Sequence, residues 1–207
     1  LINQAYSTSD FSKLSPEQTE SIIQVVKTEL VKAKTIPLLP QHIARAVEDA
    51  VNVEMGNPHD FDLYADLKEL SNRVSLSYAM KFEEKIVRSD NPLETGMQIA
   101  AAGNMIDFGA KNHNSINLDE ELQSFDAVSF AHYDIEPFRK KLQDASSLLY
   151  ICDNSGEIVF DKLFIQELQK EYPKLQITAA VRGKPILNDA TLADALFVGM
   201  DSVVPVI

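Results

Sequence analysis

The sequence predicts an α/β fold in which a parallel-sheet domain follows an all-helical domain, and three observations support this. Apolar residues recur at helical spacing through the first half of the chain. After Ser146, apolar runs of strand length alternate with helical patterns. The loops between them are short, as in a parallel sheet with right-handed crossovers. We therefore expect a helical domain over residues 1–112 and an α/β domain over residues 113–207.

Capping and turn signals mark the helical half. Ser15-Pro16-Glu17-Gln18 predicts an N-cap serine, a proline at the first helical position and a glutamine placed for a capping box. Gly56-Asn57-Pro58 predicts a turn. Small apolar residues in the segment 93–106 predict a buried helix. Further helical patterns cover the ranges 22–31, 43–51, 63–80, 119–130 and 136–144.

Strand-like runs mark the second half. Leu148–Cys152 is continuously apolar, which is typical of a strand covered on both faces, and Leu175–Val181 predicts the next strand. A helix is expected over 158–172, and another from Asn188-Asp189 onward. The apolar stretch Ser202–Ile207 predicts a third strand. Because nothing follows to cover it and no methionine opens the chain, we expect a fragment whose α/β domain is partial.

Composition narrows the function classes. With 207 residues and 45% hydrophobic content the chain can bury a core. A net charge of −12 argues against a nucleic-acid partner, although a bound divalent cation would still allow small anionic substrates. One cysteine, Cys152, excludes an internal disulfide. Neither a membrane-length apolar run nor a signal segment is present, so we expect a cytoplasmic protein without a membrane partner. Nothing indicates an oligomeric state.

Two polar turns fall where open parallel sheets bind their ligands, beyond the carboxyl ends of the strands. Asp153 and Asn154 follow the first predicted strand, and Asp189 lies after the second. Since neighbouring strands are about 4.8 Å apart, these side chains could converge. Two carboxylates and a carboxamide form an all-oxygen set suited to magnesium or manganese. The helix after Gly156 would also offer free backbone N–H groups to a phosphate.

Each of these turns also has an ordinary structural interpretation. Asp-Asn-Ser-Gly, at 153–156, is a common turn and helix cap. Asn188-Asp189 could serve only as an N-cap, and the loop 182–185 could be a solvated connection. All three fall on the same edge of one predicted sheet, and this coincidence favours a functional site.

A third polar element lies inside the apolar segment 102–109. Asn104 and Asp107 are three residues apart and therefore share one helix face. Polar side chains in so apolar a segment must be paired or line a polar cavity, because an unpaired buried polar group costs about 1–3 kcal/mol. The structural alternative is a capped helix end with Gly109 as its stop.

Three strings in this order, Ala102–Gly109, Asp153–Asp161 and Arg182–Thr191, resemble the damage-control phosphatase family. The resemblance spans nearly the whole chain. It implies a three-layer parallel-sheet domain behind a helical one, and divalent-metal-dependent hydrolysis of phosphate esters. Residues that match the family's metal ligands by position are Asp153, Asn154 and Asp189. Those that match positions near its active site are Glu157, Asn104, Asp107 and Arg182, and we add Asn188 to the predicted substrate-binding residues.

The chain also departs from the pattern of this family. Similar members carry a Cys-x-x-Cys pair near the start and a lysine-glycine element late in the chain, and this sequence has neither. Other enzyme signatures are missing as well. The four histidines have no paired spacing for zinc, no Gly-x-Gly-x-x-Gly follows a strand, and Gly-x-Ser-x-Gly and Asp-x-Asp motifs are absent. Cys152 is interpreted as a buried strand residue rather than a nucleophile.

We expect a phosphatase that hydrolyses small phosphorylated metabolites with Mn²⁺, Mg²⁺ or another first-row ion such as Co²⁺ or Ni²⁺. Asp153 would hold the ion and steer the attacking water, Glu157 would accept a proton, and Arg182 would brace the phosphate. Direct attack by an aspartate stays open as an alternative. The rival functions are a non-catalytic module that binds phospho-metabolites and, third, a protein carboxyl methyltransferase.

Overall fold

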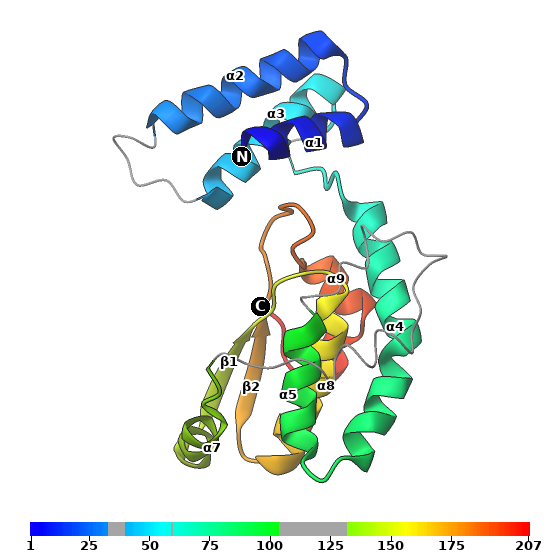
Figure 1. The fold of residues 1–207 in the computed structure, drawn as a ribbon, viewed down its shortest axis with the longest axis vertical. Coiled ribbons are helices and arrows are strands. Elements are labelled where there is room, and N and C mark those ends of the chain that lie inside the picture. The colour runs from blue at the N-terminus through cyan, green and yellow to red at the C-terminus, as the bar shows by residue number, and fades with distance from the viewer. Residues whose placement is uncertain (33–39, 59, 104–131) are drawn as a thin grey trace. The chain divides into compact units, whose positions relative to one another are not determined.

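A computed structural model of the protein describes residues 1–32, 40–58, 60–103 and 132–207 (Figure 1). This part is mostly helical with a small parallel sheet, so the predicted α/β class is confirmed. The chain forms two compact units, Leu1–Ala65 with Lys184–Leu187, and Asp66–Gly183 with Asn188–Ile207. The expected domain boundary between 112 and 113 and the helical pattern at 119–130 lie outside the described residues.

The first unit is built from α1 (Ile2–Phe11), α2 (Pro16–Lys32) and α3 (Pro40–Met55). The predicted capping box opens α2: the Gln18 amide donates to Ser15 Oγ at 3.2 Å, and the Ser15 amide donates to Gln18 Oε1 at 3.0 Å. Sequence reasoning missed α1, whose Asn, Ser, Thr and Asp residues show no apolar period. Packing stabilises it instead, since Ala5 is fully buried in the apolar core that it shares with α2 and α3.

The second unit contains the sheet and the remaining described helices. Its elements are α4 (Ala65–Arg88), α5 (Pro92–Gly103), α7 (Ile135–Asp144), β1 (Ser147–Ile151), α8 (Glu157–Glu171), β2 (Gln176–Ala180), α9 (Leu192–Phe197) and the 3₁₀ turn η2 (Met200–Ser202). In Figure 1, α5 runs beside α8. A Cβ on Gly103 would lie 2.8 Å from Phe160 Cδ2, which shows how closely these two helices approach.

The sheet is parallel, as predicted, and β2 is paired on both edges. On one side β1 pairs with it in the register Ser147↔Gln176 to Ile151↔Ala180. On the other, the Ala179 amide donates to Pro205 O, and the Ile207 amide donates to Ala179 O, each at 2.9 Å. The predicted third strand is thus reduced to a bridge at Val206, because the chain turns through η2 immediately before it.

One expectation about β1 is wrong. It is not covered on both faces, since Leu149 and Ile151 are 55% and 76% exposed while Leu148 and Tyr150 pack against the core. Alternate side chains of a strand point to opposite faces, so a fully apolar run can still present one face outward. The buried centre of this unit is α8, in which Ile158, Phe160 and Leu168 are fully buried.

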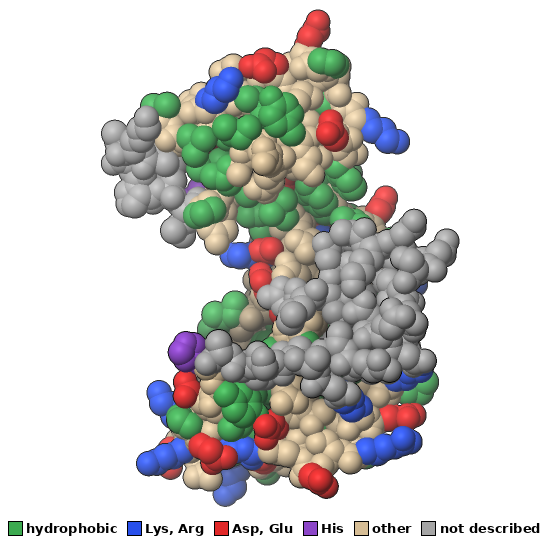
Figure 2. Space-filling model, in the orientation of Figure 1, with side chains coloured by type: hydrophobic (Ala, Val, Ile, Leu, Met, Phe, Trp, Pro, Cys, Tyr) green, Lys and Arg blue, Asp and Glu red, His purple; other side chains and the backbone are tan. Residues whose placement is uncertain are grey.

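Charged side chains of both signs are interspersed over the face seen in Figure 2. Within the described ranges, none of the helices combines the length and the apolar character that crossing a membrane requires.

Candidate functional site

The two predicted polar turns lie side by side, joined through their backbones. The Ser155 amide donates to Asn188 O at 2.8 Å, and the Ala190 amide donates to Asp153 O at 2.7 Å. These bonds make Asn154 and Asp189 partners in an antiparallel bridge. Because one turn follows β1 and the other follows β2, Asp153, Asn154 and Asp189 meet at the carboxyl edge of the sheet, where the sequence placed them.

Side-chain bonds link the same residues. Arg182 Nε donates to Asp189 Oδ2 at 2.6 Å, and Asn154 Nδ2 donates to Glu157 Oε2 at 3.1 Å. The Arg182 amide also donates to Ala190 O at 2.9 Å, so the loop between these two residues closes on itself. The structure therefore brings Arg182 and Glu157 to the three predicted metal ligands.

The site is crowded with negative charge. Burial raises the pKa of Glu157, and the charge of Asp153 adds to this while the Asn154 hydrogen bond opposes it. Burial also raises the pKa of Asp189, where Arg182 opposes the shift and Asp153 adds to it. Both shifts mean that the ionised carboxylates are disfavoured here, chiefly by burial and to a lesser extent by the charge of Asp153, and a nearby cation would oppose this.

Among the described residues, no three His, Cys, Asp or Glu side chains come together as a metal site. The predicted ligand set has a different composition, with two carboxylates and the carboxamide of Asn154. Its donors are hard oxygens, and this chemistry fits a hard divalent cation. Such an ion would share Asp189 with the Arg182 guanidinium.

The turn at 153–156 does provide the N-cap of α8, which is Gly156, but no side-chain cap bond is made there. The alternative that Asn188-Asp189 serves as an N-cap is wrong. The N-cap of α9 is Thr191, which forms a capping box with Asp194, so this helix begins later than predicted from Asn188-Asp189. Asp153, Asn154 and Asp189 are therefore not explained as helix caps.

Most backbone amides at the start of α8, which were expected to be free, are bonded. The Gly156 amide donates to Asn72 Oδ1 at 2.7 Å, and the Ile158 amide donates to Asn154 O at 3.1 Å. With the Ser155 amide bound to Asn188 O, these three amides serve to hold the turn itself.

Not every predicted residue can be placed. Asn104 and Asp107 lie outside the described residues, so their roles stay predictions. The backbone carbonyl oxygen of Asn188 accepts hydrogen bonds from the amide and from the hydroxyl of Ser155. A substrate contact of the Asn188 side chain stays a prediction. Cys152 is 5% exposed, and burial raises its thiol pKa to about 12, which argues against a nucleophile.

Sequence reasoning assigned no role to three buried polar residues of this unit. Lys68 and Asn72 are both 1% exposed in α4, and Asn72 holds the Gly156 amide. Asp161 is 3% exposed and accepts from the Tyr150 hydroxyl at 2.6 Å; burial raises its pKa to about 8. The available signal for Lys68 and Asn72 was their four-residue spacing within a helical pattern, which places both on one face.

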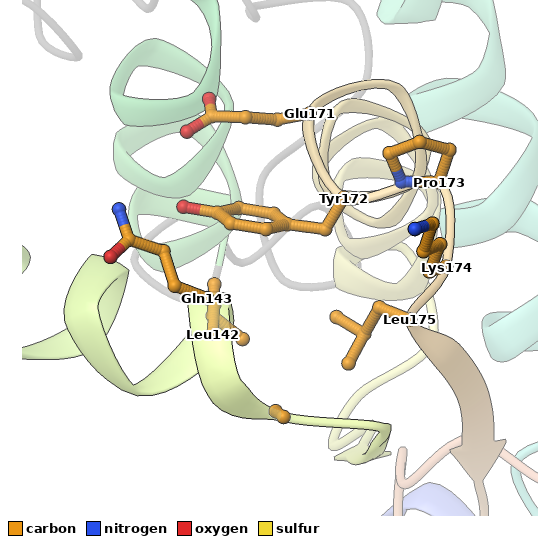
Figure 3. Close-up of a pocket in the computed structure, with 8 residues that line it drawn as sticks. Leu142, Gln143, Glu171, Tyr172, Pro173, Lys174 and Leu175 are labelled. Carbon is orange, nitrogen blue, oxygen red and sulfur yellow. The ribbon is translucent and has the colours of Figure 1, made fainter.

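A pocket in the same unit lies away from this site (Figure 3). It has a volume of about 490 Å³ and is lined by residues from the end of α7 and from the turn between α8 and β2, among them Leu142, Gln143, Tyr172 and Leu175. Since Leu175 immediately precedes β2, the pocket opens at the amino end of that strand. Ligands of parallel sheets bind at the opposite end, so it is not part of the candidate site.

Fold and site define an α/β protein with an acidic, oxygen-lined edge at the carboxyl ends of a parallel sheet. The chain matches the damage-control phosphatase ARMT1-like domain over residues 1–206, and it belongs to that family. A crystal structure of a DUF89 family protein from Pyrococcus horikoshii has a similar fold, with a TM-score of 0.77 at 23% identity over 100% of this chain and 70% of that one.

Two curated relatives are proteins of archaea. An uncharacterised protein of Methanocaldococcus jannaschii is 40% identical over 153 residues, which are 70% of this chain and 48% of that protein. A damage-control phosphatase of Archaeoglobus fulgidus is 32% identical over 167 residues, 80% of this chain and 54% of the relative. The chain thus spans about half the length of these two relatives.

Proposed function

We propose that the chain carries the metal and substrate site of a divalent-metal-dependent phosphatase for small phosphorylated metabolites. The observation that supports this most is the pairing of Asp153–Ser155 with Asn188–Ala190, which brings the backbones of Asp153, Asn154 and Asp189 together at one sheet edge. Membership of the damage-control phosphatase family supports the reaction class.

Each residue has a proposed role. Asp153, Asn154 and Asp189 would hold the ion, which when bound neutralises phosphate oxygens and acidifies water. Glu157 would accept a proton, and its raised pKa brings it toward the range in which a general base works well near neutral pH.

The remaining roles concern the substrate. Arg182 has a side chain that is 46% exposed, so its guanidinium could turn from Asp189 to a phosphate oxygen. Asn104, Asp107 and Asn188 are proposed to contact the rest of the substrate.

The experiment measures phosphate release from an aryl phosphate and a panel of sugar phosphates, with Mn²⁺, Mg²⁺, Co²⁺ or Ni²⁺ and with chelator. We expect metal-dependent release that Asp153→Asn and Asp189→Asn each reduce about 100-fold or more, because each removes a charged ligand. Asp201→Asn is the matched control, since Asp201 is exposed on η2.

Two outcomes would contradict the proposal. Binding of Mn²⁺ and of a phosphorylated compound without any phosphate release would identify a non-catalytic binding module. Equal activity of Asp189→Asn and Asp201→Asn would remove Asp189 from the site.

A further inference from the structure

Helix α4 presents a buried polar face. Lys68, Ser71, Asn72 and Ser75 are between 0% and 5% exposed, and their spacing of three, four and seven residues places them on one side of the helix. A buried helix face is ordinarily apolar, because an unpaired buried polar group is costly. A lysine is almost never fully buried unless it is paired.

The partner of Lys68 is Asp194 near the start of α9. Lys68 Nζ lies 2.7 Å from Asp194 Oδ2 and 3.4 Å from Thr191 Oγ1. Asp194 Oδ2 also accepts from the Thr191 amide at 2.8 Å and from the Thr191 hydroxyl at 2.7 Å. The buried cation therefore holds the segment that immediately follows Asp189 and Ala190.

Asn72 extends this network to the other polar turn. Its Nδ2 donates to Asp194 Oδ1 at 3.0 Å, while its Oδ1 accepts from the Gly156 amide at 2.7 Å. Gly156 directly follows the Asp153–Ser155 stretch and has φ +86°. One asparagine side chain thus connects the Asp153 turn with the start of α9, which follows the Asp189 turn.

The packing around Gly156 leaves little room for the turn to shift. A Cβ at this position would lie 3.2 Å from Ser75 Oγ and 3.3 Å from Ser71 Cβ, both on the polar face of α4. Helix α4 therefore acts on the site through hydrogen bonds and packing.

We propose that Lys68 and Asn72 are positioning residues that hold the Asp153 turn and the Asp189 turn at the separation needed to share one divalent cation. The part that concerns the cation rests on the proposed function. The part that concerns the two turns does not. Neither residue needs to touch the substrate, since each acts through Gly156, Thr191 or Asp194.

The test compares Lys68→Met and Asn72→Leu with the native chain and with Arg88→Met. Arg88 is the matched control because its exposed pair with Glu84 lies on the same helix. The first measurement is amide hydrogen exchange of peptides covering 153–157 and 188–194. We expect faster exchange in both peptides for the two α4 variants and no change for Arg88→Met.

The second measurement is the affinity for Mn²⁺ alone, taken under conditions where circular dichroism shows every variant folded. We expect binding about 10–100-fold weaker in Lys68→Met and Asn72→Leu, as for other residues that orient metal ligands. Excess Mn²⁺ should restore much of the phosphate release. The double variant Lys68→Met with Asp194→Asn leaves no unpaired buried charge and serves if Lys68→Met alone does not fold.

The outcomes separate the two proposals. Unchanged exchange in both peptides would overturn the positioning role, and so would unchanged Mn²⁺ affinity in folded variants of a chain that binds Mn²⁺. Faster exchange in a chain that neither binds Mn²⁺ nor releases phosphate would refute the proposed function and leave the holding of the turns established.

Discussion

The two turns of the candidate site differ in where their supports come from. The turn at 153–156 is held inside the second unit, by Asn72 and by the backbone of 188–190. The loop that carries Arg182 and Asp189 has its middle, Lys184–Leu187, in the first unit instead. There the Leu187 amide donates to Glu48 Oε1 at 2.6 Å, and Arg45 donates to Pro185 O at 2.5 Å.

The α4 network reaches both turns, through Gly156 on one side and through Thr191 and Asp194 on the other, and the middle of the 182–191 loop has further bonds to α3. The Asp153 turn depends on a buried polar network with an ion pair at its centre. The loop at 182–191 depends on two polar side chains of α3, because Arg45 and Glu48 bond the loop backbone at Pro185 and Leu187. Perturbing α4 and perturbing α3 should therefore have separable effects on stability.

The largest effect should follow from removing the acceptor at the centre of the α4 network. Asp194→Ala leaves the Lys68 charge buried and unpaired, and it also removes the acceptor of Asn72 and Thr191. Breaking a buried pair in this way costs about 3–5 kcal/mol. Urea unfolding, monitored by circular dichroism, measures the decrease in the free energy of unfolding.

The matched control is Glu84→Ala, which breaks an exposed ion pair in the same helix. Surface pairs of this kind contribute about 0–1 kcal/mol. Similar losses for Asp194→Ala and Glu84→Ala would mean that the buried network does not stabilise the second unit.

Much of this fold could be predicted from sequence, and the failures have physical causes. The elements around the site, β1, α8 and β2, were found because strand-length and helical periods alternate there. The meeting of Asp153, Asn154 and Asp189 followed from parallel pairing alone. In contrast, Lys68, Asn72 and Glu48 were missed, because a polar residue in a helical pattern is expected to face water. Only the tertiary structure shows these side chains to be buried.

The turn at 153–156 contains Gly156, and the loop at 182–191 contains Gly183. Gly156 has φ +86° and ψ −56°, a conformation that other residues rarely adopt, and an added Cβ would press on Ser71 and Ser75. We expect Gly156→Ala to lower the free energy of unfolding by about 1–3 kcal/mol. Gly183 has no atom within 4 Å of an added Cβ and no positive φ, so Gly183→Ala should change stability little.

Urea unfolding of both alanine variants provides the measurement. Equal losses would show that the turn at 153–156 is no more tightly supported than the loop at 182–191. A loss confined to Gly156→Ala would sharpen the contrast, because it locates the packing constraint on the side of α4.

The last effect concerns pH and the loop at 182–191. Glu48 is 1% exposed, and burial raises its carboxyl pKa from 4.5 to about 7. The Leu187 amide and the charge of Arg45 oppose this shift, whereas the charges of Asp49 and Asp62 add to it. The folded chain thus holds a proton on Glu48 that the unfolded chain releases at lower pH. Stability contributed by this group is full below pH 4.5 and is lost as the pH rises to about 7.

Glu48→Gln keeps an oxygen acceptor for the Leu187 amide but cannot ionise. Relative to the native chain, the variant should therefore gain stability as the pH rises from 5 to about 7, with no further gain above that value. Unfolding in urea at a series of pH values from 5 to 8 measures this difference, and titrations shared by both chains cancel from it. A constant difference over the series would mean that Glu48 is already ionised in the fold. In that case the charged carboxylate, and not its protonated form, would be the acceptor that holds Leu187.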